Sequence, residues 1–195
     1  MSRKYYRFFG GLLCAQEKWL NKMSEKGYRL IKTGKMLYEF EECKPEQVRY
    51  RVEFIGQKSR DNAEDYRSFL EDMGYRVFYK NINLNFSLLK LRLRPWAEKG
   101  GRIATNFTTY NRELLIVEKE NDGKPFELHT SYEDRENYYR SLRDPWLFIL
   151  IFSAIGTAVC RSVIFGVLSL ILLFPVLVYQ AQMNKNKHEA EISEQ

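Results

Sequence analysis

PWLFILIFSAIGTAVC at residues 145–160 and VIFGVLSLILLFPVLVY at residues 163–179 are the two most apolar stretches of this 195-residue chain. Only Arg161 and Ser162 separate them, and Arg161 carries the one charge between Pro145 and Tyr179. A helix needs about 17–25 apolar residues to cross hydrocarbon; the second stretch has that length and the first is slightly shorter. One helix through both would be about 50 Å long and would bury Arg161, so we predict a transmembrane hairpin that turns there. A buried helical hairpin in a soluble protein is the alternative.

The charge of the chain lies almost entirely before these stretches. Lysine and arginine total 31 residues against 25 acidic residues, which gives a net charge of +6. Only Arg161, Lys185 and Lys187, and the glutamates at positions 189, 191 and 194, follow Pro145. The part before Pro145 therefore carries the whole net charge.

Basic and aromatic residues flank the apolar stretches. Lysine and arginine are enriched on the cytoplasmic side of membrane helices, and tryptophan and tyrosine at the level of the lipid headgroups. Because Arg135 and further basic residues precede the first stretch and follow the second, we expect both termini to be cytoplasmic. The residues expected at the membrane interface are Arg140, Arg143, Trp146, Tyr179, Lys185 and Lys187.

The amino-terminal residues do not resemble a signal peptide. The chain begins MSRKYYR, and the apolar run from Phe8 to Cys14 is too short for one, so we expect the part before Pro145 to stay in the cytoplasm. Cys14, Cys43 and Cys160 lie far apart in the sequence, which favours reduced thiols over a disulfide framework or a metal site.

A sequence repeat organises the first part of the chain. Helices are predicted at about residues 15–26 and 62–73, with Gly27 and Gly74 as left-handed stops. At an offset of 47, EKWLNKMSEKGYRL from Glu17 resembles EDYRSFLEDMGYRV from Glu64. Two strand–helix–strand units predict an α+β, ferredoxin-like fold (β-α-β-β-α-β), with two helices on one face of an antiparallel sheet.

These patterns divide the chain into four parts. We expect a cytoplasmic α+β domain over residues 1–130 and a juxtamembrane helix over 131–144. Two transmembrane helices follow within 145–180, at about 145–160 and 163–179. Residues 181–195 are expected to form a disordered cytoplasmic tail.

Six segments resemble the bacterial family of domains of unknown function numbered 2812. They are YYRFF at 5–9, EKWLNKMSEKGYRL at 17–30, YEFE at 38–41, YRVEF at 50–54, GKPFELHT at 123–130 and YYR at 138–140. Many members end in membrane spans and often occur beside PadR-type transcription regulators. The resemblance therefore implies a multi-pass protein of the bacterial plasma membrane, with a role in membrane-linked regulation and a partner such as a transcription regulator. The family has no established catalytic residues, so the resemblance assigns none.

One segment departs from the form of this family. The insert from Asn81 to Thr109 is longer than the corresponding segment of the family, so the strand pairing in residues 81–120 stays open.

Residues for catalysis are few. His129 is the one histidine before the apolar stretches, and a structural role suits it better than that of a base or a ligand. The sequence contains neither a Walker loop nor GxGxxG, and it shows no cluster spaced for a metal. We expect no enzymatic activity, no cofactor and no metal.

Basic residues alternate with apolar ones in two segments. If they share one open sheet face, they form a positive surface that could contact anionic lipid or, less favourably, nucleic acid. A solvated face balanced by neighbouring glutamates is the simpler interpretation. We therefore rank an interaction or sensing module first, with a protein partner or a second copy of the chain on the free sheet face. The residues proposed for the positive surface are Arg49, Arg51, Lys90, Arg92 and Arg94.

Overall fold

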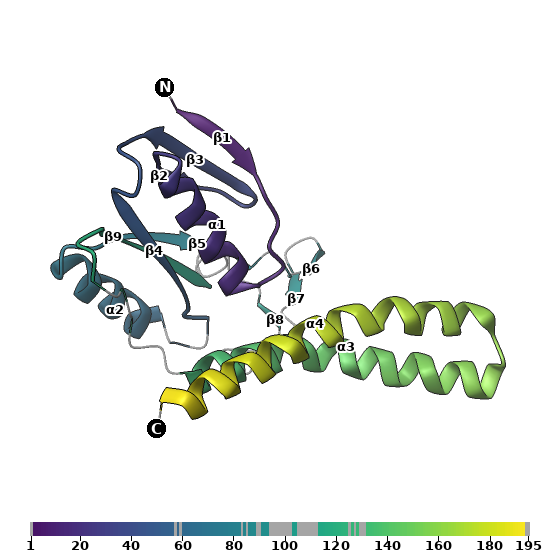
Figure 1. The fold of residues 1–195 in the computed structure, drawn as a ribbon. Coiled ribbons are helices and arrows are strands. Elements are labelled where there is room, and N and C mark those ends of the chain that lie inside the picture. The colour runs from purple at the N-terminus through teal and green to yellow at the C-terminus, as the bar shows by residue number, and fades with distance from the viewer. Residues whose placement is uncertain are drawn as a thin grey trace. The chain divides into compact units, whose positions relative to one another are not determined.

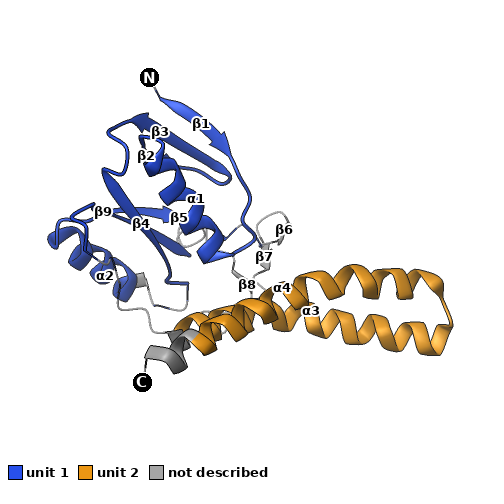
Figure 2. Cartoon of the chain, in the orientation of Figure 1, with its two compact units in different colours: residues 1–94, 99–129 blue, residues 95–98, 130–195 orange. Residues whose placement is uncertain are grey.

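The chain folds into two compact units of α+β and helical structure. Unit 1 comprises residues 1–94 and 99–129, and unit 2 comprises residues 95–98 and 130–195 (Figure 2). The computed structural model describes residues 2–56, 58, 60–82, 84, 86–88, 91–93, 103–104, 113–124, 126, 128 and 132–193.

Unit 1 contains two β-α-β-β repeats with the same strand order (Figure 1). In each repeat the third strand lies between the first two and pairs antiparallel with both, in the orders β1-β3-β2 and β4-β9-β5. A small sheet, β6-β7-β8, is formed by Phe86–Leu88, Leu91–Leu93 and Ile103–Ala104. The repeats comprise β1 Arg3–Tyr6, α1 Leu13–Glu25, β2 Tyr28–Thr33 and β3 Leu37–Glu42, then β4 Val48–Phe54, α2 Arg60–Asp72, β5 Arg76–Lys80 and β9 Leu114–Glu120.

The repeat predicted at an offset of 47 is confirmed at the helices. Both α1 and α2 have 13 residues, and their bounds differ by 47 at each end. Gly27 and Gly74 follow them with φ of +79° and +85°, which favours glycine at both helix ends. The ferredoxin-like sheet is not confirmed, because the described strands of the two repeats form two separate three-stranded sheets.

Each helix packs on the sheet of its own repeat. Trp19 of α1 makes edge-to-face contacts with Tyr5, Tyr38 and Phe40 of the first sheet. Leu70 of α2 is buried with Leu115 and Val117 of the second sheet, together with Ile55 and Phe126. Phe69 and Met73 of α2 are 49% and 51% exposed, so they lie outside this core.

One buried carboxylate connects the two sheets. Glu118 of β9 forms an ion pair with Arg29 of β2 at 2.7 Å and a longer one with Arg76 of β5 at 3.4 Å. Its second oxygen accepts a hydrogen bond from the Tyr50 hydroxyl, which itself accepts one from the Leu30 amide. Arg29 and Arg76 are equivalent in the repeat, so both copies of one position converge on the same acid.

Unit 2 is a helical hairpin. The helices α3 (Tyr132–Cys160) and α4 (Val163–Ser193) are joined at Arg161, which has a φ of +47°, and Ser162. The predicted pair of helices turning at Arg161 is confirmed. We expected a juxtamembrane helix over residues 131–144 and a transmembrane helix from about 145, but a single helix, α3, runs through Pro145.

The carboxyl-terminal segment also differs from the expectation. We predicted a disordered tail over residues 181–195, but α4 is helical to Ser193. The sequence QAQMNKNKHEAEIS, from Gln180, is rich in helix-forming residues and lacks glycine and proline, so the helix extends beyond the apolar stretch.

Small and hydroxyl side chains join the two helices of the hairpin. The Ser153 hydroxyl of α3 donates to the Phe165 carbonyl of α4 and accepts from the Ser169 hydroxyl at 3.0 Å. A Cβ added at Gly156 would lie 3.2 Å from the Phe165 ring, so glycine permits this close approach. The two helices therefore approach closely through small and hydroxyl residues, as is common between membrane helices.

The outer surface of the hairpin is apolar. Two helical segments, Asp134–Cys160 and Val163–His188, are long and apolar enough to cross a membrane, and only 11% and 17% of their most apolar windows are buried. A core helix of a soluble protein is mostly buried, whereas here Phe148, Ile164 and Phe174 are exposed. Membrane association accounts for this surface better than the alternative of a buried hairpin.

Candidate functional site

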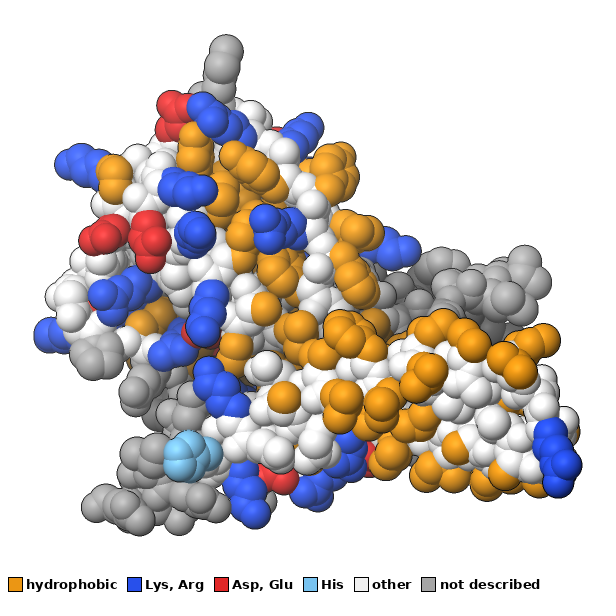
Figure 3. Space-filling view, turned by 45° about the vertical axis from the view of Figure 1, so that its right-hand side comes forward, with side chains coloured by type: hydrophobic (Ala, Val, Ile, Leu, Met, Phe, Trp, Pro, Cys, Tyr) orange, Lys and Arg blue, Asp and Glu red, His pale blue; other side chains and the backbone are white. Residues whose placement is uncertain are grey.

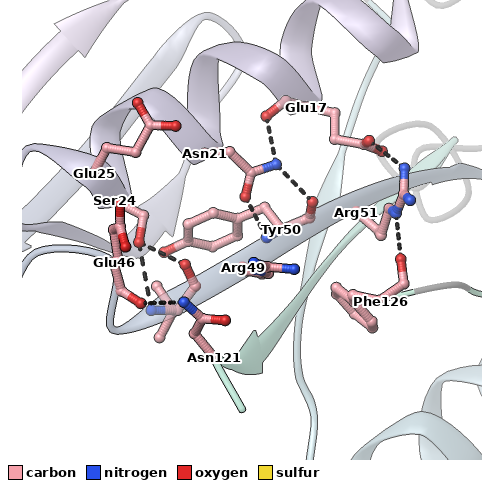
Figure 4. Close-up of a pocket in the computed structure, with 11 residues that line it drawn as sticks. Glu17, Asn21, Ser24, Glu25, Glu46, Arg49, Tyr50, Arg51, Asn121 and Phe126 are labelled. Atoms are coloured by element: carbon pink, nitrogen blue, oxygen red, sulfur yellow. Dashed lines mark hydrogen bonds and ion pairs between the residues drawn. The ribbon is translucent and has the colours of Figure 1, made fainter. Parts of the chain in front are cut away.

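A polar pocket lies between α1, β4 and the segment after β9 (Figure 4). Its volume is about 350 Å³. Carboxylate, guanidinium, amide and hydroxyl groups all reach it from unit 1. The lining residues are Glu17, Asn21, Ser24, Glu25, Glu46, Val48, Arg49, Tyr50, Arg51, Asn121 and Phe126.

Side chains of α1 form one wall of the pocket by bonding the edge of β4. The Asn21 amide bonds both the Tyr50 carbonyl, at 3.0 Å, and the Tyr50 amide, at 2.8 Å. The Ser24 hydroxyl donates to the Val48 carbonyl, and Glu17 accepts from the Val52 amide. Glu17, Asn21 and Ser24 recur at helical spacing, and every second residue of β4 points its backbone toward them. The side chains of α1 therefore supply hydrogen-bond partners to backbone amides and carbonyls of β4, which is an edge strand and has no neighbour among the described strands on that side.

Two arginines of β4 line the pocket beside this wall. Arg51 forms an ion pair with Glu17 at 2.5 Å and donates to the Phe126 carbonyl at 2.6 Å. Arg49 is exposed and donates to the Lys124 carbonyl at 3.3 Å. Both guanidinium groups are thus positioned by other groups of unit 1, and part of their donor capacity is already used.

The predicted positive surface is only partly described. Arg49 and Arg51 lie together in β4, whereas Arg92 lies in β7, which belongs to a different sheet. Lys90 and Arg94 lie outside the described residues, as does His129. Contact of these residues with an anionic surface stays a prediction.

Glu46 lies at the rim of the pocket in an unusual backbone conformation. Its φ is +57°, a region that costs a residue with a Cβ about 1–2 kcal/mol. Its amide donates to the Ser24 carbonyl, and its own carbonyl accepts from the Asn121 side chain. Among the described residues, the Glu46 and Glu25 carboxylates have no hydrogen-bond or ion-pair partner. Strained backbone of this kind concentrates at functional sites.

A second, much smaller cavity of unit 1 contains buried polar groups that sequence analysis missed. Lys80 is 3% exposed, and burial lowers its pKa to about 8. Its ammonium donates to the carbonyls of Gly34 and Lys35 and lies 4.2 Å from the centre of the Tyr38 ring. The cavity volume of about 10 Å³ is close to that needed by one water. The Gln16 amide nitrogen beside it is buried and has no hydrogen-bond partner among the residues that the structure describes.

The residues predicted at the membrane interface lie near the polar ends of the hairpin helices. Arg143 of α3 donates to Gln180 of α4 at 2.6 Å, where both apolar stretches end. Trp146 is half-buried, and Tyr179 is 5% exposed, so its ring packs inside the structure. A further cavity of unit 2 is lined by Arg140, Arg143 and Lys187, whereas Lys185 is not part of its lining.

No group of His, Cys, Asp and Glu able to hold a metal occurs within the described part of the chain. Cys14, Cys43 and Cys160 are free thiols. The pocket between α1 and β4 offers charged and hydrogen-bonding groups that the fold already holds in place.

The comparisons with known proteins point to one family. No curated protein and no solved structure matches the chain. Residues 13–151 match the family described as protein of unknown function (DUF2812), a match that begins at α1 and ends within the first apolar helix. Because this match covers well over half of the sequence, the chain belongs to the DUF2812 family.

Proposed function

We propose that this protein is a membrane-anchored binding module of the bacterial plasma membrane. In this proposal the α3–α4 hairpin anchors the chain, with both termini in the cytoplasm, and unit 1 binds a partner protein there. The pocket between α1 and β4 is the binding site. Membrane-linked regulation is the process that such a module would serve.

The apolar surface of the hairpin supports the anchoring part of the proposal. The exposed side chains of both helices are almost all hydrophobic from Leu147 to Leu177, apart from the turn at Arg161. Burying each such side chain away from water contributes about 1.5–3 kcal/mol, so a bilayer would stabilise this conformation strongly.

The unpaired carboxylates of the pocket carry the binding part of the proposal. Glu25 and Glu46 are exposed at its rim, and Arg49 presents the remaining donors of its guanidinium nearby. A partner surface with a lysine or arginine next to a carboxylate would complement this arrangement. The φ of Glu46, a conformation that glycine adopts without strain, supports a role for its side chain beyond folding.

Contact with anionic lipid through β4 is the second candidate. The net charge of +6 and the exposure of Arg49 favour it. However, Arg51 is already neutralised by Glu17, and two free carboxylates share the same pocket. We therefore rank a protein partner first, and lipid binding would be recognised by its steep fall with salt.

Site-specific photo-crosslinking in native membranes tests the proposal. The full chain carries a photoreactive amino acid in place of Arg49, or in place of Lys4, an exposed residue of β1 that does not line the pocket. We expect a discrete protein adduct from position 49 alone. We also expect Glu25→Gln combined with Glu46→Gln to reduce this adduct severalfold. Equal labelling from both positions, or an adduct unchanged by the glutamine substitutions, contradicts the proposal.

A further inference from the structure

A polar cavity of about 480 Å³ lies between α3 and α4 of unit 2. The hydrogen bond from Arg143 to Gln180 closes its apolar end, and both helices are polar beyond this point. Figure 3 shows hydrophobic side chains over the hairpin, with Lys and Arg side chains at the two ends of this apolar region. The residues that matter here are Glu136, Arg140, Arg143, Gln180, Asn184 and Lys187.

The position of the cavity along the hairpin matches a lipid headgroup. Residues 163–179 of α4 rise by about 25 Å at 1.5 Å per residue. The cavity begins at Gln180, so it lies nearly one hydrocarbon thickness, about 30 Å, from the turn at Arg161. When the hairpin spans a bilayer, the cavity is at the headgroup level of the leaflet opposite the turn.

The charges of the cavity favour an anion. Arg140, Arg143 and Lys187 contribute three cations, against the single carboxylate of Glu136. Glu136 accepts from Arg140 at 2.8 Å, and Asp144, just outside the lining, accepts from Arg143 at 2.6 Å. The ammonium of Lys187 has no ion-pair or hydrogen-bond partner in the part of the chain that the structure describes. An anion in this cavity would therefore accept hydrogen bonds from the unpaired ammonium of Lys187. It could also accept them from guanidinium N–H groups that the ion pairs leave unused.

An apolar track continues from the cavity along α4. Leu173, Leu177, Gln180, Asn184 and Lys187 follow one another at spacings of three or four residues, which places them on one stripe of the helix. Leu177 is 56% exposed and Leu173 39% exposed. The same stripe thus changes from cationic and polar to apolar at the headgroup boundary, and a free phosphate ion would not use its apolar half.

We propose that this cavity binds the phosphodiester headgroup of an anionic glycerophospholipid such as phosphatidylglycerol. The phosphate oxygens accept hydrogen bonds from Lys187 and Arg140, and an acyl chain lies along Leu177 and Leu173. Guanidinium and ammonium groups both bind phosphate, and basic pockets between membrane helices on the cytoplasmic side are suited to lipid headgroups. This inference rests on the membrane anchoring proposed above, and it is independent of the pocket in unit 1.

Lipid retention by the full chain tests the inference. The protein is reconstituted into nanodiscs of phosphatidylcholine doped with phosphatidylglycerol and extracted into mild detergent, and native mass spectrometry measures the ratio of the two lipids retained. The variant Arg140→Gln with Lys187→Gln removes two cations from the cavity. The control Arg161→Gln with Lys185→Gln removes the same charge from positions that do not line it.

We expect the preference for phosphatidylglycerol to fall about 30-fold in the cavity variant, as two lost phosphate contacts imply, and to persist in the control. An equal fall in both variants contradicts the inference, because it shows attraction by net charge without a site. Displacement of the lipid by inorganic phosphate also overturns it and assigns the cavity to the free ion.

A wash of the membranes with alkaline carbonate separates this inference from the proposed anchoring. Release of the wild-type chain by the wash means that the anchoring itself is wrong. A chain that stays in the membrane but retains both lipids in their bulk ratio overturns the lipid site alone.

Discussion

At the scale of single residues, Lys80 is a cation held in a buried environment of unit 1. Its ammonium is buried, with two backbone carbonyls and the Tyr38 ring as its described partners. Burial lowers its pKa to about 8 from the ordinary 10.5. At neutral pH the ammonium is charged although buried, and a shift of this size lowers the free energy of unfolding by roughly 3 kcal/mol.

This shift predicts that stability rises with pH. Between about pH 8 and 10.5 the folded state has released the Lys80 proton while the unfolded chain still binds it, so the free energy of unfolding increases across this window. The rise is absent in Lys80→Met. Chemical denaturation of the full chain in detergent at several pH values measures both slopes. Burial raises the pKa of Tyr38 in the folded state, so near pH 10 the unfolded chain releases this proton first and stability falls. This effect is common to both proteins, so the difference between their slopes reports Lys80. Parallel slopes in the two proteins would contradict the prediction.

The wall of the α1–β4 pocket shows a limit of sequence analysis at this scale. Glu17, Asn21 and Ser24 have the composition of a solvated helix face, and the sequence gives no signal that they bond an edge strand. Their role depends on the position of β4 as an edge, which is set by pairing with β9 more than 60 residues later. Such long-range pairing leaves no local pattern.

At the scale of elements, the two glycine stops are equivalent in sequence but not in packing. A Cβ on Gly27 would lie 2.9 Å from the Cys43 carbonyl oxygen, whereas a Cβ on Gly74 meets nothing within 4 Å. We expect Gly74→Ala to cost about 1 kcal/mol, from its positive φ alone. Gly27→Ala should cost about 2 kcal/mol more, because it also overpacks a backbone oxygen.

Chemical denaturation of the two full-length variants in the same detergent measures this difference. The matched positions make each variant the control of the other. Equal losses would show that the loop around Cys43 moves away at little cost, and that the repeat is symmetrical in energy as well as in sequence.

The elements also differ in how well the sequence predicted them. The hairpin turn at Arg161 was predicted correctly, because a lone arginine between two long apolar stretches has few positions that it can occupy. The α1 and α2 helices follow from apolar spacing and their glycine stops. The division of the strands into two sheets could not be predicted from the sequence. The central strand of the second sheet, Leu114–Glu120, lies beyond the long insert and is far from its partners in the chain.

At the scale of the whole molecule, the three free cysteines report the proposed orientation. Cys160 is exposed beside the turn, whereas Cys14 and Cys43 lie in unit 1. With both termini in the cytoplasm, a membrane-impermeant maleimide added to intact cells should label Cys160 in a variant with Cys14→Ser and Cys43→Ser. It should label Cys43, in a variant with Cys14→Ser and Cys160→Ser, only after the cells are permeabilised. The opposite pattern would invert the proposed topology.

The placement of the insert within the second repeat has a consequence for how the chain is assembled during synthesis. Residues 34–36 connect β2 to the central strand of the first sheet, whereas residues 81–113 connect β5 to that of the second. Closing a connection about eleven times longer costs roughly 2 kcal/mol more in chain entropy. The first repeat is complete once Glu42 has left the ribosome, but the second must wait for β9. During that interval β4 lacks β9, the strand with which it pairs, whereas α1, whose Asn21 and Ser24 side chains bond β4, has already been synthesised.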